Sequence, residues 1–326
     1  MKILVIGAAG MLGGQLIQKL ATKSTLNYLP ITKIIRHDVV LPPPPPQSSF
    51  PIETLMADMA ADGQAAAAIK DRPDVIFHLA AIVSGEAEAD FEKGYRINLD
   101  GTRNLLEAIR LVGDGYKPKF VFTSSIAVFG TPFPDAIDDT FLSAPLTSYG
   151  TQKAICELLI SDYSRRGILD GIAMRMPTVC VRPGKPNKAA SGFFSNIIRE
   201  PLVGLEAVLP VDDSVRHWHA SPRSAVNMLI HGAELDSIKL GNRRAISMPG
   251  LSCTVAEQIA ALRRVAGPEA AKLIRREPDP LIQKIVSGWP QNFNPMRAIE
   301  LGFVGDDSFE DIIRIHIADQ LQGNIN

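Results

Sequence analysis

The sequence predicts an α/β protein with a doubly wound parallel sheet and a smaller C-terminal α+β region. Short runs rich in Val, Ile and Phe alternate with helical patterns through the first half of the chain. Such runs are typical of strands that helices cover on both faces of a parallel sheet. A glycine-rich turn follows the first run directly, and prolines and glycines become frequent after about residue 176. We therefore expect a sheet domain at 1–176 and a second region at 177–326, from which some segments return to the sheet.

Periodicity along the chain gives the expected elements in order. Strands are predicted at 3–8, 31–37, 75–81 and 120–126, and helices at 11–22, at 97–112 and from about Tyr149. In the second half, helices are predicted at 223–235, after Thr254 and after Ser308. Thr254 and Glu257 have the spacing of a capping box, which marks a helix start.

A run of five prolines interrupts this alternation at residues 41–49, "LPPPPPQSS". Proline has no N–H to donate to a sheet, and consecutive prolines favour a stiff, extended polyproline II segment. We expect a surface excursion between the second and third strands. The alternative, a ligand for the proline-binding groove of a partner, stays open.

Composition excludes several classes of function. The 326 residues include 34 basic and 35 acidic side chains, a balance that does not favour a nucleic-acid or membrane-surface partner. No apolar run reaches the roughly 18 residues of a membrane span, and the apolar N-terminus is too brief for a signal peptide. Three scattered cysteines are too few for a disulfide framework or a zinc site. These features favour a reducing, cytoplasmic setting and no bound metal.

Three glycines, Gly7, Gly10 and Gly13, stand between the first strand and the first helix. Glycines at this place allow a tight turn and let the backbone approach a pyrophosphate group at the helix N-terminus. The spacing G-x-x-G-x-x-G resembles that of the extended branch of the short-chain dehydrogenase/reductase superfamily, the NAD-dependent epimerase/dehydratase group. This resemblance implies a Rossmann sheet that binds a nicotinamide dinucleotide.

An acidic residue is expected to end the second strand and bind the adenosine ribose hydroxyls. Asp38 has this place, and its carboxylate would repel a 2′-phosphate, which favours NAD over NADP; Arg36, two residues earlier, weakens this preference slightly. By the same resemblance, Asp58 contacts the adenine amino group. The other residues expected to contact NAD are Met11, Leu12, Met59, Leu79, Ala80, Ala81, Asn98, Tyr149, Lys153 and Pro177.

Tyr149 and Lys153 have the spacing i and i+4, so both lie on one face of the predicted helix. A tyrosine is a poor base at its ordinary pKa of about 10. A nearby ammonium group favours the phenolate and brings the tyrosine toward the working pH of a general base. The sequence therefore predicts an acid–base pair, in which Lys153 also holds the nicotinamide ribose.

The resemblance adds further catalytic candidates around this pair. Ser125, the second of two serines that end the strand predicted at 120–126, the fifth expected strand of the sheet, would hold the reacting oxygen, with Ser124 as its neighbour. Asn98 matches the asparagine of the preceding helix in the family and would steady a water molecule or the lysine. His78 lies in an apolar run, and we expect it to be a core histidine rather than a catalyst.

Most of the chain resembles a narrower set, the D-erythronate 2-dehydrogenases. The likeness extends through "HLAAIVSGEAE", "GYRINLDGTRNL", "TSYGTQKAICELL" and "RHWHASPRSAV". It implies NAD-dependent oxidation of the C2 hydroxyl of a small sugar acid, with 177–326 as the main substrate-binding region. Lys185, Lys188 and Asn196 lie in that region as further polar candidates. The residues expected to bind the substrate are Ser84, Ser125, Tyr149, Arg182, Asn187, Ser191 and Arg216.

Two other functions remain open at this point. A nucleotide-sugar epimerase or dehydratase would share the glycine turn and the catalytic residues but would retain its reduced cofactor. A cofactor-sensing Rossmann protein would need the glycine turn alone, and the presence of Ser125, Tyr149 and Lys153 argues against it. The resemblance also implies a homodimer that pairs through the helices carrying Asn98 and Tyr149.

Overall fold

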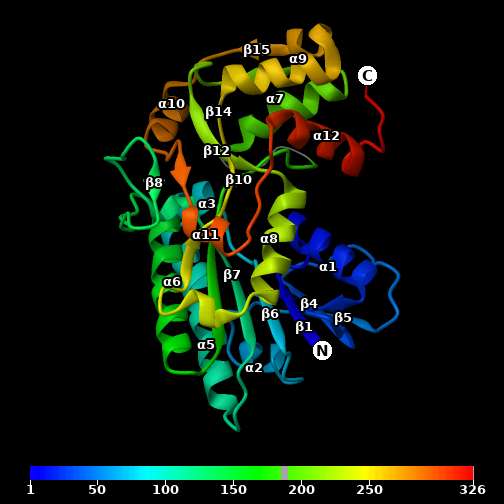
Figure 1. Ribbon diagram of the computed structural model, residues 1–326, viewed down its shortest axis with the longest axis vertical. Helices are drawn as coiled ribbons and strands as arrows, with labels where there is room; N and C mark the ends of the chain where they lie inside the picture. Colours follow the sequence, from blue (N-terminus) through cyan, green and yellow to red (C-terminus); the bar gives the residue numbers. More distant parts are fainter. Residues whose placement is uncertain (185–189, 326) are drawn as a thin grey trace. The chain divides into compact units, whose positions relative to one another are not determined.

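The structure is a computed structural model that describes residues 1–184 and 190–325 (Figure 1). The described chain divides into two compact units. Unit 1 comprises Met1–Val128, Thr147–Arg175 and Val226–Ser247, and unit 2 comprises Phe129–Leu146, Met176–Ala225 and Met248–Asn326. Residues 129–146 thus belong to the second unit, and residues 226–247 belong to the first.

Unit 1 is built on a seven-stranded sheet in the order β13-β9-β7-β6-β1-β4-β5. The strands are β1 (Lys2–Ile6), β4 (Lys33–Asp38), β5 (Ile52–Met56), β6 (Val75–His78), β7 (Lys119–Ser125), β9 (Asp170–Met176) and β13 (Ala245–Ser247). The registered pairs are parallel, and β1 lies between β4 and β6. The chain therefore winds outward from β1 in both directions, and the predicted doubly wound α/β class is confirmed.

Helices cover both faces of this sheet. They are α1 (Met11–Lys23), α2 (Gln64–Ala68), α3 (Ser84–Ala89), α4 (Phe91–Gly94), the π-helix η1 (Tyr95–Asp100), α5 (Gly101–Val112), α6 (Ser148–Arg165) and α8 (Pro222–Glu234), which enters unit 1 at Val226. In Figure 1, α5 and α6 lie on one side of β7. On their face, Phe120 and Phe122 of β7 share a buried cluster with Leu105 and Ile160. The predicted helix at 97–112 is divided, because its first residues form the π-helix.

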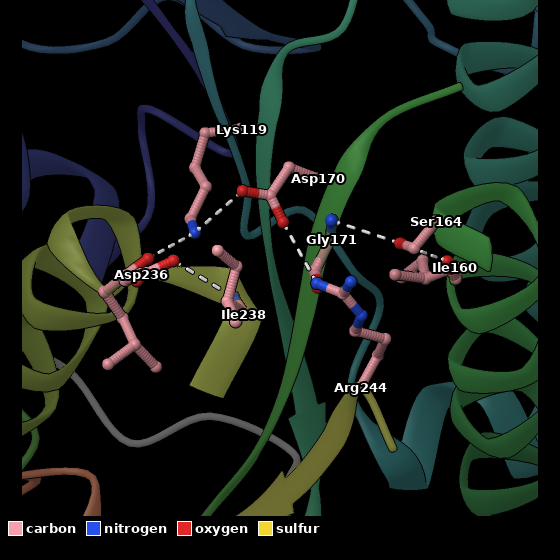
Figure 2. Close-up of polar contacts among 9 residues, drawn as sticks. Lys119, Ile160, Ser164, Asp170, Gly171, Asp236, Ile238 and Arg244 are labelled. Atoms are coloured by element: carbon pink, nitrogen blue, oxygen red, sulfur yellow. Dashed lines mark hydrogen bonds and ion pairs between the residues drawn. The ribbon is translucent and has the colours of Figure 1, made fainter. Parts of the chain in front are cut away.

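The last strand of the sheet comes from late in the chain, and charged groups attach it (Figure 2). Arg244 Nη1 donates to Asp170 Oδ1 at 3.0 Å, just before β13 pairs with β9. Lys119 Nζ donates to the other oxygen of Asp170 at 3.1 Å and to the carbonyl of Leu235 at 2.7 Å. Asp170 is thus held between two cations at the start of β9, and the segment 226–247 is bound to the sheet at that edge.

The proline segment lies between β4 and β5, mostly exposed and without regular secondary structure, as predicted. Its anchor is the buried Arg36 of β4. The guanidinium donates to the carbonyl of Pro43 and to the hydroxyl of Thr54, each at 2.6 Å. The sequence did not indicate this role for Arg36.

The sheets of unit 2 are smaller than that of unit 1. The three-stranded sheet contains β10 (Thr178–Val179), β12 (Arg216–Ala220) and β14 (Leu251–Thr254); β11 (Ala207–Leu209) pairs with β15 (Ile274–Arg276), and β8 (Ile137–Asp138) with β16 (Phe293–Asn294). The helices are α7 (Gly192–Leu202), α9 (Val255–Lys272, broken at Gly267), α10 (Pro280–Ser287), α11 (Met296–Glu300) and α12 (Phe309–Gln320). The predicted capping box of Thr254 and Glu257 is confirmed. No helix in the described part of the chain is long and apolar enough to cross a membrane.

Candidate active site

The glycine turn lies at the carboxyl end of β1, beside the loop that follows β6. Gly7 has a φ of +89°, and a Cβ there would stand 2.7 Å from the backbone nitrogen of Ala80. A Cβ on Gly13 would collide with the carbonyl oxygen of Gly7. Gly10 is the N-cap of α1, and Leu79 donates its N–H to Ile6 at 2.8 Å. Backbone atoms leave no room for a side chain at Gly7 or Gly13, and a turn of this kind fits a dinucleotide pyrophosphate at the start of the helix.

Asp38 ends β4 against this turn. Its Oδ2 accepts the N–H of Ala9 at 2.8 Å, and its Oδ1 accepts the N–H of Val39, also at 2.8 Å. These bonds fix the carboxylate at the edge of the glycine turn, where ribose hydroxyls would approach. Arg36 donates to Pro43 and Thr54 instead, so its guanidinium is already engaged away from a 2′-phosphate.

Apolar side chains lie beside Asp38 at the ends of β4 and β5. Val39, Val40 and Met56 are 62%, 56% and 55% exposed, and Met56 is the register partner of Asp38. Exposed apolar residues at this edge of the sheet suit the flat ring of adenine. Val39 and Val40 were not among the residues predicted to contact NAD, although two valines directly after the acidic residue were a usable signal.

Asp58 lies in the loop that follows β5. Its carboxylate accepts hydrogen bonds from Arg96 Nη1 at 2.5 Å and from the N–H of Ala60 at 2.9 Å. Burial alone would raise the pKa of Asp58, but the bonds from Arg96 and Ala60 hold this pKa below its usual value. An anionic Asp58 can accept from an amino group. The neighbouring Met59 is buried.

The tyrosine and lysine lie in the first turns of α6, as the spacing predicted. Thr147 caps the helix, with its hydroxyl accepting the N–H of Gly150 at 3.1 Å. Lys153 is only 2% exposed, and its Nζ donates to the carbonyl of Thr123 at 2.8 Å. The same Nζ lies 4.5 Å from the ring centre of Phe122 and 5.7 Å from that of Tyr149. A buried cation therefore stands beside the tyrosine ring.

Burial lowers the pKa of Lys153 to about 8, an effect that Cys156 and Glu157 partly oppose. Burial thus makes the ammonium form of Lys153 unfavourable, and its few hydrogen-bond and charge partners stabilise that form. A group with this balance is found more often at functional sites than elsewhere.

The two serines at the end of β7 have different surroundings. Ser125 is half-buried, and its hydroxyl oxygen accepts the N–H of Ala127 at 3.1 Å, a bond that does not use the hydroxyl hydrogen. Ser124 is buried and donates to Glu157 Oε1 at 2.5 Å. Ser125 is therefore the serine that can donate to a substrate oxygen.

Asn98, in the π-helix, binds groups other than the lysine. Its Oδ1 accepts the N–H of Ile82 at 2.9 Å, and its Nδ2 donates to the carbonyl of Ile82 at 3.2 Å and to Gln152 Oε1 at 2.8 Å. Gln152 is fully buried, directly before Lys153. Asn98 thus joins the loop after β6 to α6. Gln152 was not predicted from the sequence, because its partner Asn98 lies 54 positions away.

His78 is a core residue, as predicted. Its ring is buried, and its Nε2 lies 2.9 Å from the hydroxyl of Thr102, which itself donates to the carbonyl of Asn98. Since that hydroxyl gives its hydrogen to Asn98, the histidine nitrogen must be the donor. Burial lowers the pKa of His78 to about 3, so the ring is neutral at physiological pH.

Several residues expected to bind the substrate belong to unit 2. Arg182 Nη2 donates to the hydroxyl of Ser191 at 2.9 Å, which joins two of the predicted residues. Arg216 begins β12 and pairs with Glu257 at 3.3 Å. The remaining expected residues lie as follows: Asn196 accepts from Arg199, Pro177 lies between β9 and β10, Ser84 begins α3 of unit 1, and Lys185, Asn187 and Lys188 are outside the described residues.

Unit 2 also contains an open cavity of about 420 Å³. Its lining includes Arg199, Glu200 and His316, together with apolar side chains such as Leu205. None of the predicted site residues that the structure describes lines this cavity, so we assign it no part of the chemistry.

The position of Asp38 predicts a preference between dinucleotides. We expect NAD to bind at least about tenfold more tightly than NADP, a difference of about 1.4 kcal/mol, because the carboxylate accepts ribose hydroxyls and repels a phosphate. Asp38→Ala should narrow this gap, whereas Asp62→Ala, at an exposed residue of the same unit, should leave it unchanged. Isothermal titration calorimetry measures the affinities of each protein for NAD and for NADP. Equal affinities for the two dinucleotides in the unaltered protein would contradict the assignment.

Comparisons with known proteins show the family of the chain. Residues 3–219 match the NAD dependent epimerase/dehydratase family. A D-erythronate dehydrogenase of Cupriavidus necator is 46% identical over 98% of each chain. A D-erythronate dehydrogenase of Haemophilus influenzae is 41% identical over 96% of this chain and 98% of its own.

Two solved structures extend the comparison. A crystal structure described as a nucleoside-diphosphate-sugar epimerase from Agrobacterium tumefaciens is 61% identical, with a TM-score of 0.98 over 100% of this chain and 96% of its own. An L-threonine dehydrogenase from Cupriavidus necator, covering 98% of this chain and 99% of its own, has a TM-score of 0.83 at 23% identity, which shows the fold alone. The family match over two thirds of the sequence and the two relatives similar along nearly all of it confirm the predicted resemblance: the chain belongs to the NAD dependent epimerase/dehydratase family.

Proposed function

We propose that the protein is a dehydrogenase that oxidises the C2 hydroxyl of D-erythronate with NAD, giving 2-dehydro-D-erythronate. The similarity to two relatives named D-erythronate dehydrogenase, along nearly the whole chain, supports this substrate. The observation that carries the chemistry is Lys153, a buried cation 5.7 Å from the ring centre of Tyr149. Such a pair suits removal of a proton from an alcohol.

The residues of unit 1 suit NAD as the cofactor. The glycine turn would hold the pyrophosphate, Asp38 the adenosine ribose, and the apolar edge at Val39 and Met56 the adenine. NAD, when bound, supplies the acceptor for the hydride that leaves C2. Lys153 has three N–H groups, of which the bond to Thr123 uses one, so the nicotinamide ribose hydroxyls are suitable partners for the others.

Tyr149 is the proposed general base. Its phenolate would take the proton of the C2 hydroxyl, and the Lys153 ammonium would stabilise the negative charge on the phenolate. Ser125 would donate its hydroxyl hydrogen to the same substrate oxygen and orient it. Asn98 and Gln152 would hold the loop after β6 and the catalytic helix in a fixed relation. No step of this scheme needs a metal.

The carboxylate of a sugar acid needs a cation or several donors. Arg182 and Arg216 of unit 2 are both candidates. The guanidinium of Arg182 is oriented by Ser191 and by the carbonyl of Val179, and that of Arg216 by Ser252 and Glu257. Each already has fixed partners, so a carboxylate would meet a positioned cation. Ser84 and Ser191 are candidates for the substrate hydroxyls.

A second function has a specific observation in its favour. The solved structure that is 61% identical bears the description nucleoside-diphosphate-sugar epimerase. An epimerase would use the same Tyr149 and Lys153 but would return the hydride to its substrate within one binding event. It would therefore release no NADH, whereas a dehydrogenase must release NADH in each turnover.

Replacement of Tyr149 tests the base directly. Tyr149→Phe removes one oxygen and preserves the ring, so NAD binding should persist while kcat falls by about 10²–10⁴-fold. Tyr163→Phe, on the same helix, should retain most of the activity. Steady-state NADH formation and NAD calorimetry measure the two effects, and a Tyr149→Phe protein with normal kcat would show that the residue is not the base.

A substrate panel separates the two functions. With NAD, we expect NADH formation from D-erythronate and none from the neutral polyol erythritol or from uridine and guanosine diphosphate sugars. Replacing the arginine that binds the carboxylate, by Arg182→Ala or Arg216→Ala, should raise KM at least tenfold, because a charge-assisted hydrogen bond contributes about 1.5–3 kcal/mol. The exposed Arg276→Ala is the matched control. Conversion of a nucleotide sugar, with no NADH from any four-carbon hydroxy acid, would establish the epimerase instead.

We also propose that the protein works as a cytoplasmic homodimer. Its three cysteines are free and buried, as suits a reducing compartment. The helices α5 and α6 have exposed leucines, Leu111 at 71% and Leu158 at 72%. Sedimentation equilibrium should give a dimer that Leu158→Glu weakens and that Leu142→Glu, at an exposed loop residue, leaves intact; a monomeric native protein would contradict this.

A further inference from the structure

A buried ion pair lies directly behind the catalytic residues of unit 1. Glu157 of α6 is 4% exposed, and Arg175 near the end of β9 holds it with two nitrogens. Arg175 Nε lies 3.0 and 3.2 Å from the two carboxylate oxygens, and Nη2 lies 2.8 Å from Oε2. The proposed reaction assigns no role to either residue, although Glu157 is one helical turn beyond Lys153.

The pair is connected to both catalytic elements. Ser124 of β7 donates to Glu157 at 2.5 Å, and the adjacent Thr123 accepts from Lys153 at 2.8 Å. Two neighbouring residues of the strand thus bind two side chains that are one turn apart on the helix. These bonds fix the register of α6 on β7, and with it the relation of Tyr149 to Ser125.

Few charged groups lie around Lys153, and most of the ionisable side chains near it are neutral. From its own helix it faces Tyr149, Cys156 and Glu157, and burial raises the pKa of the Cys156 thiol, which keeps it neutral. His78 of β6 is neutral as well. At the helix start, Glu88 of α3 accepts the N–H of Ser148 at 2.9 Å. Glu157, backed by Arg175 from β9, is therefore the buried anion on the lysine's own helix.

An ion pair this deep is a costly way to join a helix to a sheet. Apolar residues of similar size would often give equal or greater stability, because desolvation of two charges offsets much of their attraction. We propose that Glu157 and Arg175 are positioning residues that set the charge balance around Tyr149 and Lys153. This inference deepens the proposed function, since it concerns the same base.

The two members of the pair should act in opposite directions. Glu157→Gln keeps the shape and leaves the positive charge of Arg175 uncompensated, which favours the phenolate, so Tyr149 ionises at a lower pH. Arg175→Met leaves the negative charge, which disfavours the phenolate, so Tyr149 ionises at a higher pH. For unit charges about 10 Å away in a partly buried site, each shift should be about 0.5–1 pH unit.

The ionisation of Tyr149 can be followed in the full chain without any sugar acid. Ultraviolet difference absorbance measures the formation of tyrosinate. For each protein, the same protein with Tyr149→Phe added gives the signal of the other four of the five tyrosines, which is subtracted. Titrations are run with and without NAD, and thermal unfolding checks that each protein is folded. Two controls keep the charges, Arg175→Lys and Ser124→Ala, and should shift the transition by less than half as much.

Opposed shifts, with the double variant Glu157→Gln/Arg175→Met between them, would support the proposal. It is overturned if both variants shift the same way, if neither shifts, or if no transition belongs to Tyr149. Should one single variant not fold, the sign of the shift in the other decides. The double variant buries no unpaired charge and serves if both single variants fail to fold. A shift of its Tyr149 transition by more than about 0.5 pH unit from that of the native protein would then overturn the proposal.

The outcome is separable from that of the proposed function. The titration needs no substrate, so opposed shifts in a protein that does not oxidise D-erythronate would sustain this inference and reject the substrate. A protein that oxidises D-erythronate but shows no opposed shifts would sustain the substrate and reject this inference. A pH profile of kcat for Glu157→Gln adds an independent reading, because a purely structural role would lower kcat without moving the profile toward lower pH.

Discussion

The ammonium group of Lys153 constrains the centre of unit 1. It is buried, and its bond to the carbonyl of Thr123 joins α6 to β7, the strand that ends in Ser125. Burial lowers its pKa to about 8, so the charge depends on the groups packed around it. The ring face of Phe122 and the carboxylate of Glu157 both act on this one group.

The glycine turn imposes a second constraint, which is steric rather than electrostatic. The backbone of Gly7 meets that of Ala80, so β1 and the loop after β6 approach more closely than side chains would allow. The carboxylate of Asp38 then binds the turn through the N–H of Ala9. Cofactor preference and local folding are thus connected, because the residue that would receive the ribose also holds the loop that would receive the pyrophosphate.

The relatives illustrate how a shared fold can bear different names. The chain resembles proteins named D-erythronate dehydrogenase and a structure described as a nucleoside-diphosphate-sugar epimerase. The proton chemistry proposed for Tyr149 and Lys153 would serve either activity, because it depends only on two residues four positions apart on one helix. Selection between substrates depends on the polar groups that bind them, and the candidates in this chain are Arg182, Ser191 and Arg216. Function in this family is therefore argued from the substrate-binding residues and not from the fold.

The sequence by itself determined the features that depend on local spacing. Apolar runs located the strands, the glycine spacing located the turn, and the interval between Tyr149 and Lys153 placed both on one helix face. The tertiary structure alone decided which polar groups are partners. Three such contacts join segments that no periodicity relates: the pairing of Glu157 with Arg175, the bond from Arg36 to Pro43, and the return of residues 226–247 to the sheet. The reason is physical: periodicity records which residues share a face of one element, whereas a buried polar group takes its partner from whichever other element the folded chain brings within hydrogen-bond distance.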